Sequence, residues 1–94
     1  MRVLEKTASF ERAYKKFVKN NPRLGQKVDD AIRQMEINPF APFLFTHKLG
    51  GNLSGVLACS CGYDCRILFT IERDNKTGNE MIVLLSVGTH DLVY

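Results

Sequence analysis

The spacing of the apolar residues changes near the middle of the chain, and this change constrains the fold more than any other feature of the sequence. Between residues 10 and 38, apolar side chains recur every three or four positions, which is the period of an amphipathic helix. From residue 53 onward they come in short runs of near-alternating pattern, separated by turn residues, which is typical of strands. This order predicts an α+β domain in which the helices pack on one face of an antiparallel sheet.

The first half of the chain is predicted to form a strand and two helices. Charged and apolar residues alternate over Arg2–Lys6, which favours a strand with one covered face. Helical spacing begins after Ser9, a suitable N-cap residue. Asn21 ends this helix and caps a second one, which begins at Pro22 and runs to about Asn38. Two helices joined by so short a turn are expected to form a hairpin.

The second half is predicted to form three antiparallel strands. Their segments are Leu53 to Cys61, Cys65 to Arg73 and Met81 to Val87. In the middle segment Ile67, Phe69 and Ile71 occupy alternate positions, so we expect them to pack on the helices. The intervening side chains, beginning with Arg66, then line the opposite face, where a site could form. The predicted order is strand, two helices and three strands (β-α-α-β-β-β).

The totals agree with one domain over residues 1–94, because 45% hydrophobic and 24% charged residues are ordinary globular composition. Apolar runs are only a few residues long, which predicts no membrane span, and we expect a cytoplasmic protein. The net charge is +3, but residues 1–33 contain nine of the 13 lysines and arginines against four acids. This basic half suits a polyanionic partner, although a solvated basic helix face has the same composition.

Three cysteines lie within seven residues, at positions 59, 61 and 65. An odd number suits a reducing compartment better than a disulfide framework. Their spacing differs from that of common structural zinc sites, and both histidines are distant in sequence. We therefore expect Cys59, Cys61 and Cys65 to be small buried apolar residues, and we predict no metal site.

The last seven residues, 88–94, are polar and ionisable although they directly follow an apolar strand. They contain His90, Asp91 and Tyr94. Such a segment is either a solvated chain end or part of a site at the sheet edge. If the middle strand lies beside the last one, Asp64 and Arg66 come close to this segment. A histidine that transfers a proton, an arginine that binds phosphate and an aromatic ring that stacks on a base are what a metal-free RNA nuclease requires.

Three motifs together resemble a known group of proteins. They are His47-Lys48-Leu49-x-Gly51-x-Leu53-x-Gly55, then Gly62-Tyr63-Asp64-x-Arg66-Ile67-Leu68-Phe69, and then Gly88-Thr89-His90-Asp91 followed by Tyr94. In this order and spacing they resemble the RelE/ParE superfamily of toxins from bacterial type II toxin–antitoxin systems, in particular the YafQ-like messenger-RNA interferases. The resemblance covers almost the whole chain and implies a RelE-like fold.

The resemblance also implies which residues form the site. In YafQ-like enzymes two histidines, an aspartate and an aromatic residue do so, and the matching residues here are His47, Asp64, His90 and Tyr94. A further family histidine falls on Ser60, which weakens a direct transfer of roles. Arg66, in contrast, matches an arginine that steadies the scissile phosphate in RelE-like members.

The implied activity is cleavage of messenger RNA in the decoding site of the ribosome, with no metal or other cofactor. The 2′-hydroxyl would attack the adjacent phosphate in line, and the 5′-oxygen would leave. His90 is expected to protonate that oxygen, while Asp64 or His47 orients or deprotonates the 2′-hydroxyl. Arg66 and Lys48 would stabilise the charged phosphorane.

Three residues are expected to bind RNA: Lys48, Arg66 and Tyr94, the last by stacking on or positioning a base. Each candidate also has a purely structural interpretation. Asp64 lies in a hairpin turn, where aspartate is favoured for local hydrogen bonding. Arg66 could pair with Asp64 across this turn, and Lys48 could be a solvated charge.

Two other functions fit the same sequence. The ParE branch shares the fold but inhibits DNA gyrase by binding, and its members lack the C-terminal histidine cluster, so His90 and Tyr94 favour the nuclease. A toxin-like binding module without activity is the second alternative, and Ser60 is the argument for it. In every case the resemblance implies a cognate antitoxin protein as partner; the nuclease would also bind messenger RNA and the ribosome, and no membrane partner is expected.

Overall fold

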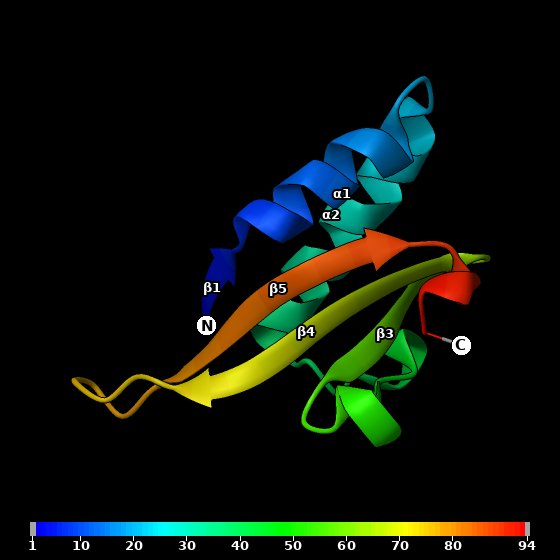
Figure 1. Cartoon of the computed structure of the whole chain (residues 1–94). Helices are drawn as coiled ribbons and strands as arrows, with labels where there is room; N and C mark the ends of the chain where they lie inside the picture. The colour runs from blue at the N-terminus through cyan, green and yellow to red at the C-terminus, as the bar shows by residue number, and fades with distance from the viewer. Residues whose placement is uncertain (1, 94) are drawn as a thin grey trace.

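Within residues 2–93, which are those that the structure describes, five strands form one sheet with two helices on one of its faces (Figure 1). The structure is a computed structural model, and the side chain of Val93 is not described. The elements are β1 (Val3–Lys6), α1 (Ala8–Val18), α2 (Pro22–Ile37), β2 (His47–Lys48), β3 (Leu57–Gly62), β4 (Cys65–Arg73) and β5 (Glu80–Gly88). Short 3₁₀ helices add η1 (Pro42–Leu44), η2 (Gly51–Leu53) and η3 (His90–Val93). This arrangement confirms the predicted α+β class.

The strands lie in the order β1-β5-β4-β3-β2. β3, β4 and β5 are antiparallel, as predicted. β1 pairs with β5 in parallel, with Val3 opposite Met81. A parallel pair needs a long crossover connection, and the hairpin of α1 and α2 is part of the chain that connects β1 to the rest of the sheet. The two helices cover one face of the sheet because they belong to the segment that connects β1 to the strands it joins.

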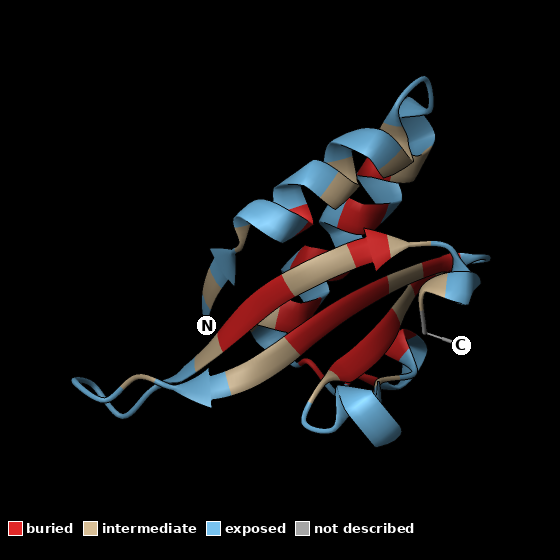
Figure 2. Ribbon diagram, in the orientation of Figure 1, coloured by how far each residue is buried: buried red, intermediate tan, exposed pale blue. Residues whose placement is uncertain are grey.

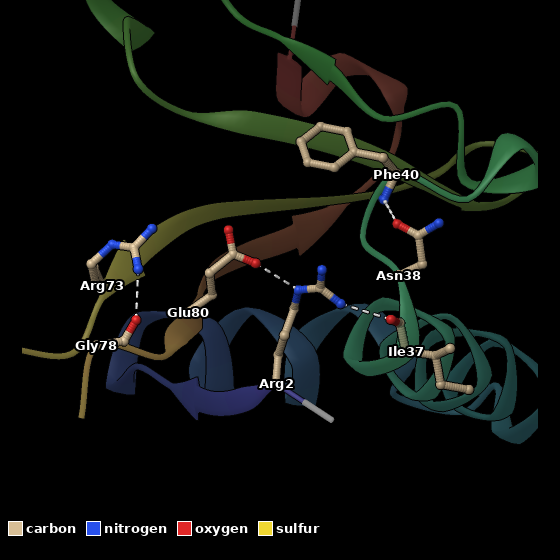
Figure 3. Close-up of polar contacts among 7 residues, drawn as sticks. All are labelled: Arg2, Ile37, Asn38, Phe40, Arg73, Gly78 and Glu80. Atoms are coloured by element: carbon tan, nitrogen blue, oxygen red, sulfur yellow. Dashed lines mark hydrogen bonds and ion pairs between the residues drawn. The ribbon is translucent and has the colours of Figure 1, made fainter.

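Arg2 connects the beginning of β1 to two other elements (Figure 3). Its Nε donates to Glu80 Oε1 at 2.9 Å, at the start of β5, and its Nη1 donates to the carbonyl of Ile37 at 2.7 Å, at the end of α2. The backbone N–H of Arg2 also donates to the carbonyl of Glu36 at 3.1 Å. These bonds hold the short parallel strand in register with β5.

The core lies between the helices and the sheet, where buried residues follow the strands and the inner faces of the helices (Figure 2). Ile67 and Phe69 are fully buried and Ile71 is half-buried against the core, as the alternation predicted. The helix α2 contributes Val28, Ala31, Ile32 and Met35. Leu68, on the opposite sheet face, is buried as well, at 8% exposure. Among the described residues no helix is both long enough and apolar enough to cross a membrane.

The start of α1 differs from the prediction, because Thr7 and not Ser9 is its N-cap residue. Thr7 Oγ1 accepts from the N–H of Phe10 at 3.0 Å and donates to the carbonyl of Leu84 at 2.8 Å. The second bond joins the cap to β5, a long-range contact that local pattern does not reveal. Asn21 caps α2 as predicted, since its side chain accepts from the N–H of Leu24 at 3.3 Å.

The first predicted strand of the second half, Leu53 to Cys61, is also wrong at its beginning. Residues 51–53 form the helix η2, and β3 begins only at Leu57. The reason is backbone conformation: Gly51 and Gly55 have φ values of +62° and +89°, which turn the chain before the strand. The same turn allows the two residues of β2 to pair with β3, so that His47 lies opposite Ala58. β2 was not predicted.

Cys59, Cys61 and Cys65 are all buried, as expected, but the expectation that none forms a disulfide is wrong, because Cys61 and Cys65 are bonded with their Cα atoms 5.1 Å apart. Sequence spacing alone does not contain the hairpin geometry that brings these two residues together across the turn 62–64. Cys59 remains a thiol in the core, and burial raises its pKa to about 12.

Candidate functional site

The register of β3, β4 and β5 places the predicted site residues in rows across the sheet. Ser60 lies opposite Arg66, and Arg66 lies opposite Gly88. Directly paired residues share a face, and Arg66 alternates with the buried Ile67, so this row lies on the face opposite the helices. His47 shares that face, since its partner Ala58 is two residues from Ser60. The sheet thus places His47, Ser60 and Arg66 on one face.

The C-terminal segment is held against the β3–β4 turn up to residue 93. The N–H of His90 donates to Asp64 Oδ1 at 2.9 Å, across 26 residues of sequence. Asp64 has a φ of +55°, a left-handed conformation that aspartate tolerates better than most residues. The segment then turns into η3, with the N–H of Leu92 donating to the carbonyl of Thr89 at 2.9 Å. Asp64 therefore has a structural role as an acceptor for the first residue of η3.

The imidazole of His90 is 54% exposed, and its Nδ1 lies 3.6 Å from Asp91 Oδ1. This distance is within ion-pair range when the ring carries a proton. Asp91 had no predicted role, and no sequence pattern distinguished it from a turn residue. Tyr94, which was predicted to contact a base, lies outside the described residues.

Arg66 is half-buried, and its guanidinium is oriented by three acceptors. Nη1 donates to the carbonyl of Cys65 at 2.8 Å, to the carbonyl of Gly62 at 3.2 Å and to Ser60 Oγ at 3.4 Å. Within the described part of the chain all its hydrogen bonds run through Nη1, so Nε and Nη2 are available to an anion. The predicted pairing of Arg66 with Asp64 does not occur among these contacts.

Ser60 is a site residue whose role the sequence did not reveal. Its hydroxyl donates to the carbonyl of Gly62 at 3.1 Å and accepts from the N–H of the same residue at 3.3 Å, as well as from Arg66. These bonds span an irregularity of the β3–β4 register between Ser60 and Gly62. Ser60 therefore supports the local backbone and orients the guanidinium of Arg66.

His47 lies on β2, the edge strand that pairs with β3. Its Nδ1 lies 3.0 Å from the carbonyl of Phe45, and a carbonyl can only accept. Nδ1 therefore carries the proton of the neutral ring, and Nε2 is the basic nitrogen. Lys48 follows with an exposed side chain.

A cavity of about 780 Å³ opens beside these residues, between α2, η1 and the β3–β4 hairpin. Its lining is Lys27, Asp30, Ala31, Gln34, Phe43, Leu44, Phe45, His47, Ser60, Cys61, Gly62, Tyr63 and Arg66. His47 and Arg66 are the predicted site residues within it, whereas Asp64, Lys48 and His90 do not line it. The described residues contain no group of three or more histidine, cysteine, aspartate or glutamate side chains arranged to hold a metal.

No protein-family model matches the chain, and no curated protein matches it. Several solved structures do. A YoeB/ParE toxin from Agrobacterium tumefaciens is 20% identical, with a TM-score of 0.76 over 96% of this chain and 99% of the other. YafQ from Escherichia coli is 14% identical, with a TM-score of 0.77 over 100% and 99% of the two chains.

A YoeB–YefM complex from Staphylococcus aureus contains a chain that is 20% identical, with a TM-score of 0.69 over 96% and 98% of the two chains. Identities this low establish the fold alone. The predicted RelE-like fold, and with it the structural resemblance to the RelE/ParE superfamily, is confirmed.

Proposed function

We propose that this chain, which has the RelE-like fold, is the toxin of a type II toxin–antitoxin system and cleaves messenger RNA as a metal-independent endoribonuclease. One observation supports the proposal above all: the guanidinium of Arg66 is oriented by hydrogen bonds and lies on the same sheet face as His47. Arg66 also lies opposite Gly88, two residues before His90. An anion-binding group between two imidazoles is the minimum that phosphodiester cleavage by proton transfer requires.

In the proposed reaction the 2′-oxygen of one nucleotide attacks the adjacent phosphorus, and the bond from phosphorus to the 5′-oxygen breaks. His47 Nε2 accepts the proton of the 2′-hydroxyl, because Nδ1 is engaged with the carbonyl of Phe45. His90 donates a proton to the leaving 5′-oxygen, and its distance from Asp91 allows an ion pair in the protonated state. Arg66 stabilises the phosphorane through Nε and Nη2. The products are a cyclic phosphate and a 5′-hydroxyl.

Asp64 takes a positioning role in this scheme and not that of the base. One of its carboxylate oxygens already accepts from the backbone of His90, which holds the proposed acid near the hairpin. Lys48 follows His47 on β2 and is exposed, but it pairs with the core residue Leu57 and therefore lies on the other face of the sheet. We keep its proposed contact with the RNA backbone at the open edge of β2, and Tyr94 keeps its proposed role in contacting a base. These roles complete the assignment of the predicted residues.

The proposed partners are an antitoxin protein, messenger RNA and the decoding site of the ribosome. In the Staphylococcus aureus complex YoeB is bound to YefM, and the corresponding partner here would be the product of an adjacent gene. Exposed basic side chains on α1, at Arg12, Lys15 and Lys16, are suited to a polyanion.

Message cleavage by matched variants tests the proposal. The wild type, His90→Ala and His47→Ala are compared by primer extension on a message with and without ribosomes, and Lys76→Ala in the distant β4–β5 loop is the control. We expect new message ends with the wild type and the control, and a loss of rate of roughly 10²–10⁴ for each histidine variant. Equal cleavage by the wild type and His90→Ala would remove His90 as the acid.

The rival function is gyrase inhibition, and we consider it because a YoeB/ParE toxin is among the similar structures. It makes the opposite prediction in two assays run side by side. Inhibition of DNA supercoiling by the wild type, together with an absence of new message ends, would refute the nuclease and support the ParE-like alternative.

A further inference from the structure

Two large apolar side chains beside the proposed site, Phe43 and Phe45, are exposed to solvent. Phe43 is 58% exposed and Phe45 is 72% exposed, on the connection between α2 and β2. Between them Leu44 is fully buried and fixes this segment to the core. The segment is therefore anchored while the two rings on either side of the anchor remain on the surface.

Phe45 is held in an uncommon backbone conformation. Its φ is +50°, in the left-handed region that large side chains rarely adopt, and its N–H donates to the carbonyl of Pro42 at 3.2 Å. Its own carbonyl is the acceptor for His47 Nδ1. Local strain of this kind is concentrated at functional sites, and here it orients the ring and the proposed base through one backbone unit.

Two cations, Lys27 and Arg66, also line the cavity. Lys27, from α2, lies against Gly62, because a Cβ built on Gly62 would be 3.3 Å from Lys27 Cδ. The carbonyl of Gly62 accepts from Arg66 at 3.2 Å. Two cations therefore converge at Gly62, and within the described lining Asp30 is the single acidic residue.

Exposed aromatic rings and two cations that line the same cavity match the chemistry of a nucleotide, which combines a flat base with an anionic phosphate. The volume of about 780 Å³ is within the range of small-molecule sites, roughly 300–1,000 Å³. The cavity also includes His47 and Arg66 of the proposed cleavage site, so a nucleotide bound in it is contiguous with the scissile phosphate.

We propose that this cavity binds the base of an RNA nucleotide next to the cleaved phosphate, by stacking on Phe45 and Phe43. The proposal rests on the proposed nuclease function and extends it with a base-binding subsite built from residues outside the three motifs. Lys27 binds the phosphate of the same nucleotide. An apolar peptide segment of a protein partner is the competing occupant, but it carries no negative charge to complement two cations beside one acid.

The test is a double-mutant cycle between protein and RNA. The full chain binds a short fluorescent RNA with 2′-O-methyl riboses, which cannot be cleaved, and its affinity is measured by anisotropy. One nucleotide at a time is replaced by an abasic one, in complexes with the wild type, Phe45→Ala and Phe45→Trp. Phe40→Ala is the matched control, since Phe40 is 56% exposed on the same connection but does not line the cavity. Figure 3 shows its N–H donating to Asn38 Oδ1.

We expect Phe45→Ala to weaken binding about tenfold, to have no further effect on RNA that is abasic at one particular position, and to be rescued by Phe45→Trp. Phe40→Ala should change nothing, and thermal melting verifies that each variant is folded. Equal affinities of the wild type and Phe45→Ala, or no binding by the wild type, would overturn the inference.

Two further measurements separate this inference from the proposed function. Message cleavage by the wild type without coupling at Phe45 refutes the base-binding subsite and leaves the nuclease intact, whereas coupling without cleavage refutes the nuclease. If Phe45→Ala binds the protein encoded by the adjacent gene more weakly than the wild type does, but binds RNA equally well, the cavity is a protein-docking surface and the inference is overturned.

Discussion

Asp64 provides the sharpest test of how the site works, because its two interpretations predict opposite outcomes for one substitution. Asp64→Asn keeps an oxygen that accepts from the N–H of His90 and suits the φ of +55°, but it removes the carboxylate. Asp64→Gly also suits this backbone conformation but removes the acceptor. The pair of variants therefore separates the charge from the hydrogen bond.

The expected sizes follow from the contact. Hydrogen bonds to charged groups contribute about 1.5–3 kcal/mol in general, and exposure of both partners reduces this to about 1 kcal/mol here. Loss of the bond in Asp64→Gly shifts the equilibrium between the held and the released C-terminal segment by roughly fivefold. Asp64→Asn should retain most of the activity. A general base, in contrast, would cost roughly 10²–10⁴ in either variant.

Two assays verify this reasoning. Cleavage rates are measured by primer extension, and hydrogen exchange of the His90 amide reports whether the segment is held. We expect faster exchange in Asp64→Gly than in Asp64→Asn. Asp74→Asn is the control, because Asp74 Oδ1 accepts from the N–H of Lys76 at 2.9 Å in a turn beyond the other end of β4. A hundredfold loss of rate in Asp64→Asn, with His90 exchange unchanged, would refute the positioning role.

Three other sets of substitutions, at Ser60, at the disulfide and at Cys59, have defined outcomes. Ser60→Ala removes one acceptor of Arg66 and two hydrogen bonds to Gly62, so we expect about a tenfold loss of cleavage and a fall of about 1–2 kcal/mol in the free energy of unfolding, whereas Ser60→Thr retains both. Replacing Cys61 and Cys65 by serine should lower the free energy of unfolding by about 2 kcal/mol, the chain-entropy value for so short a loop, as should reducing the wild type with dithiothreitol. Burial raises the pKa of Cys59 from 9.0 to about 12. The neutral thiol therefore contributes its full stability below pH 9, and the free energy of unfolding falls as the pH rises toward 12, by up to about 4 kcal/mol. Cys59→Ala should show a smaller fall over this pH range in chemical denaturation.

Each of these outcomes can contradict its premise. Full activity of Ser60→Ala would show that the two carbonyl acceptors alone orient Arg66. Unfolding that is insensitive to dithiothreitol and to the double serine substitution would show that the disulfide adds no stability. An identical fall in stability of the wild type and Cys59→Ala above pH 9 would assign the alkaline transition to other groups.

The regular elements could be predicted because their signals are local. Asn21 and Pro22 specify the start of α2 by their own backbone preferences, and the alternation at Ile67 and Phe69 follows from the two-residue period of a strand. Predictions failed where a distant contact decided the outcome. Thr7 is the N-cap of α1 partly because its hydroxyl also reaches the carbonyl of Leu84, 77 residues away.

The candidate site divides in the same way. The motifs made His47, Arg66 and His90 candidates, because the identity of a side chain and its place in a short segment can be read directly. The motifs did not reveal what these residues contact. The orientation of Arg66 by Ser60 depends on an irregular hairpin, and the base-binding rings on the α2–β2 connection belong to none of the three motifs.

By itself, therefore, the sequence determined α1, α2, the sheet faces, the strands other than β2 and the residue types available for chemistry, since these depend on periodicity and local conformational preference. Only the tertiary structure decided the parallel pairing of β1 with β5, the Cys61–Cys65 disulfide and the role of Asp64 as the acceptor for the His90 backbone. These features depend on strand register and on left-handed turn conformations. Such long-range geometry brings together residues that are distant in sequence, and no local pattern encodes it.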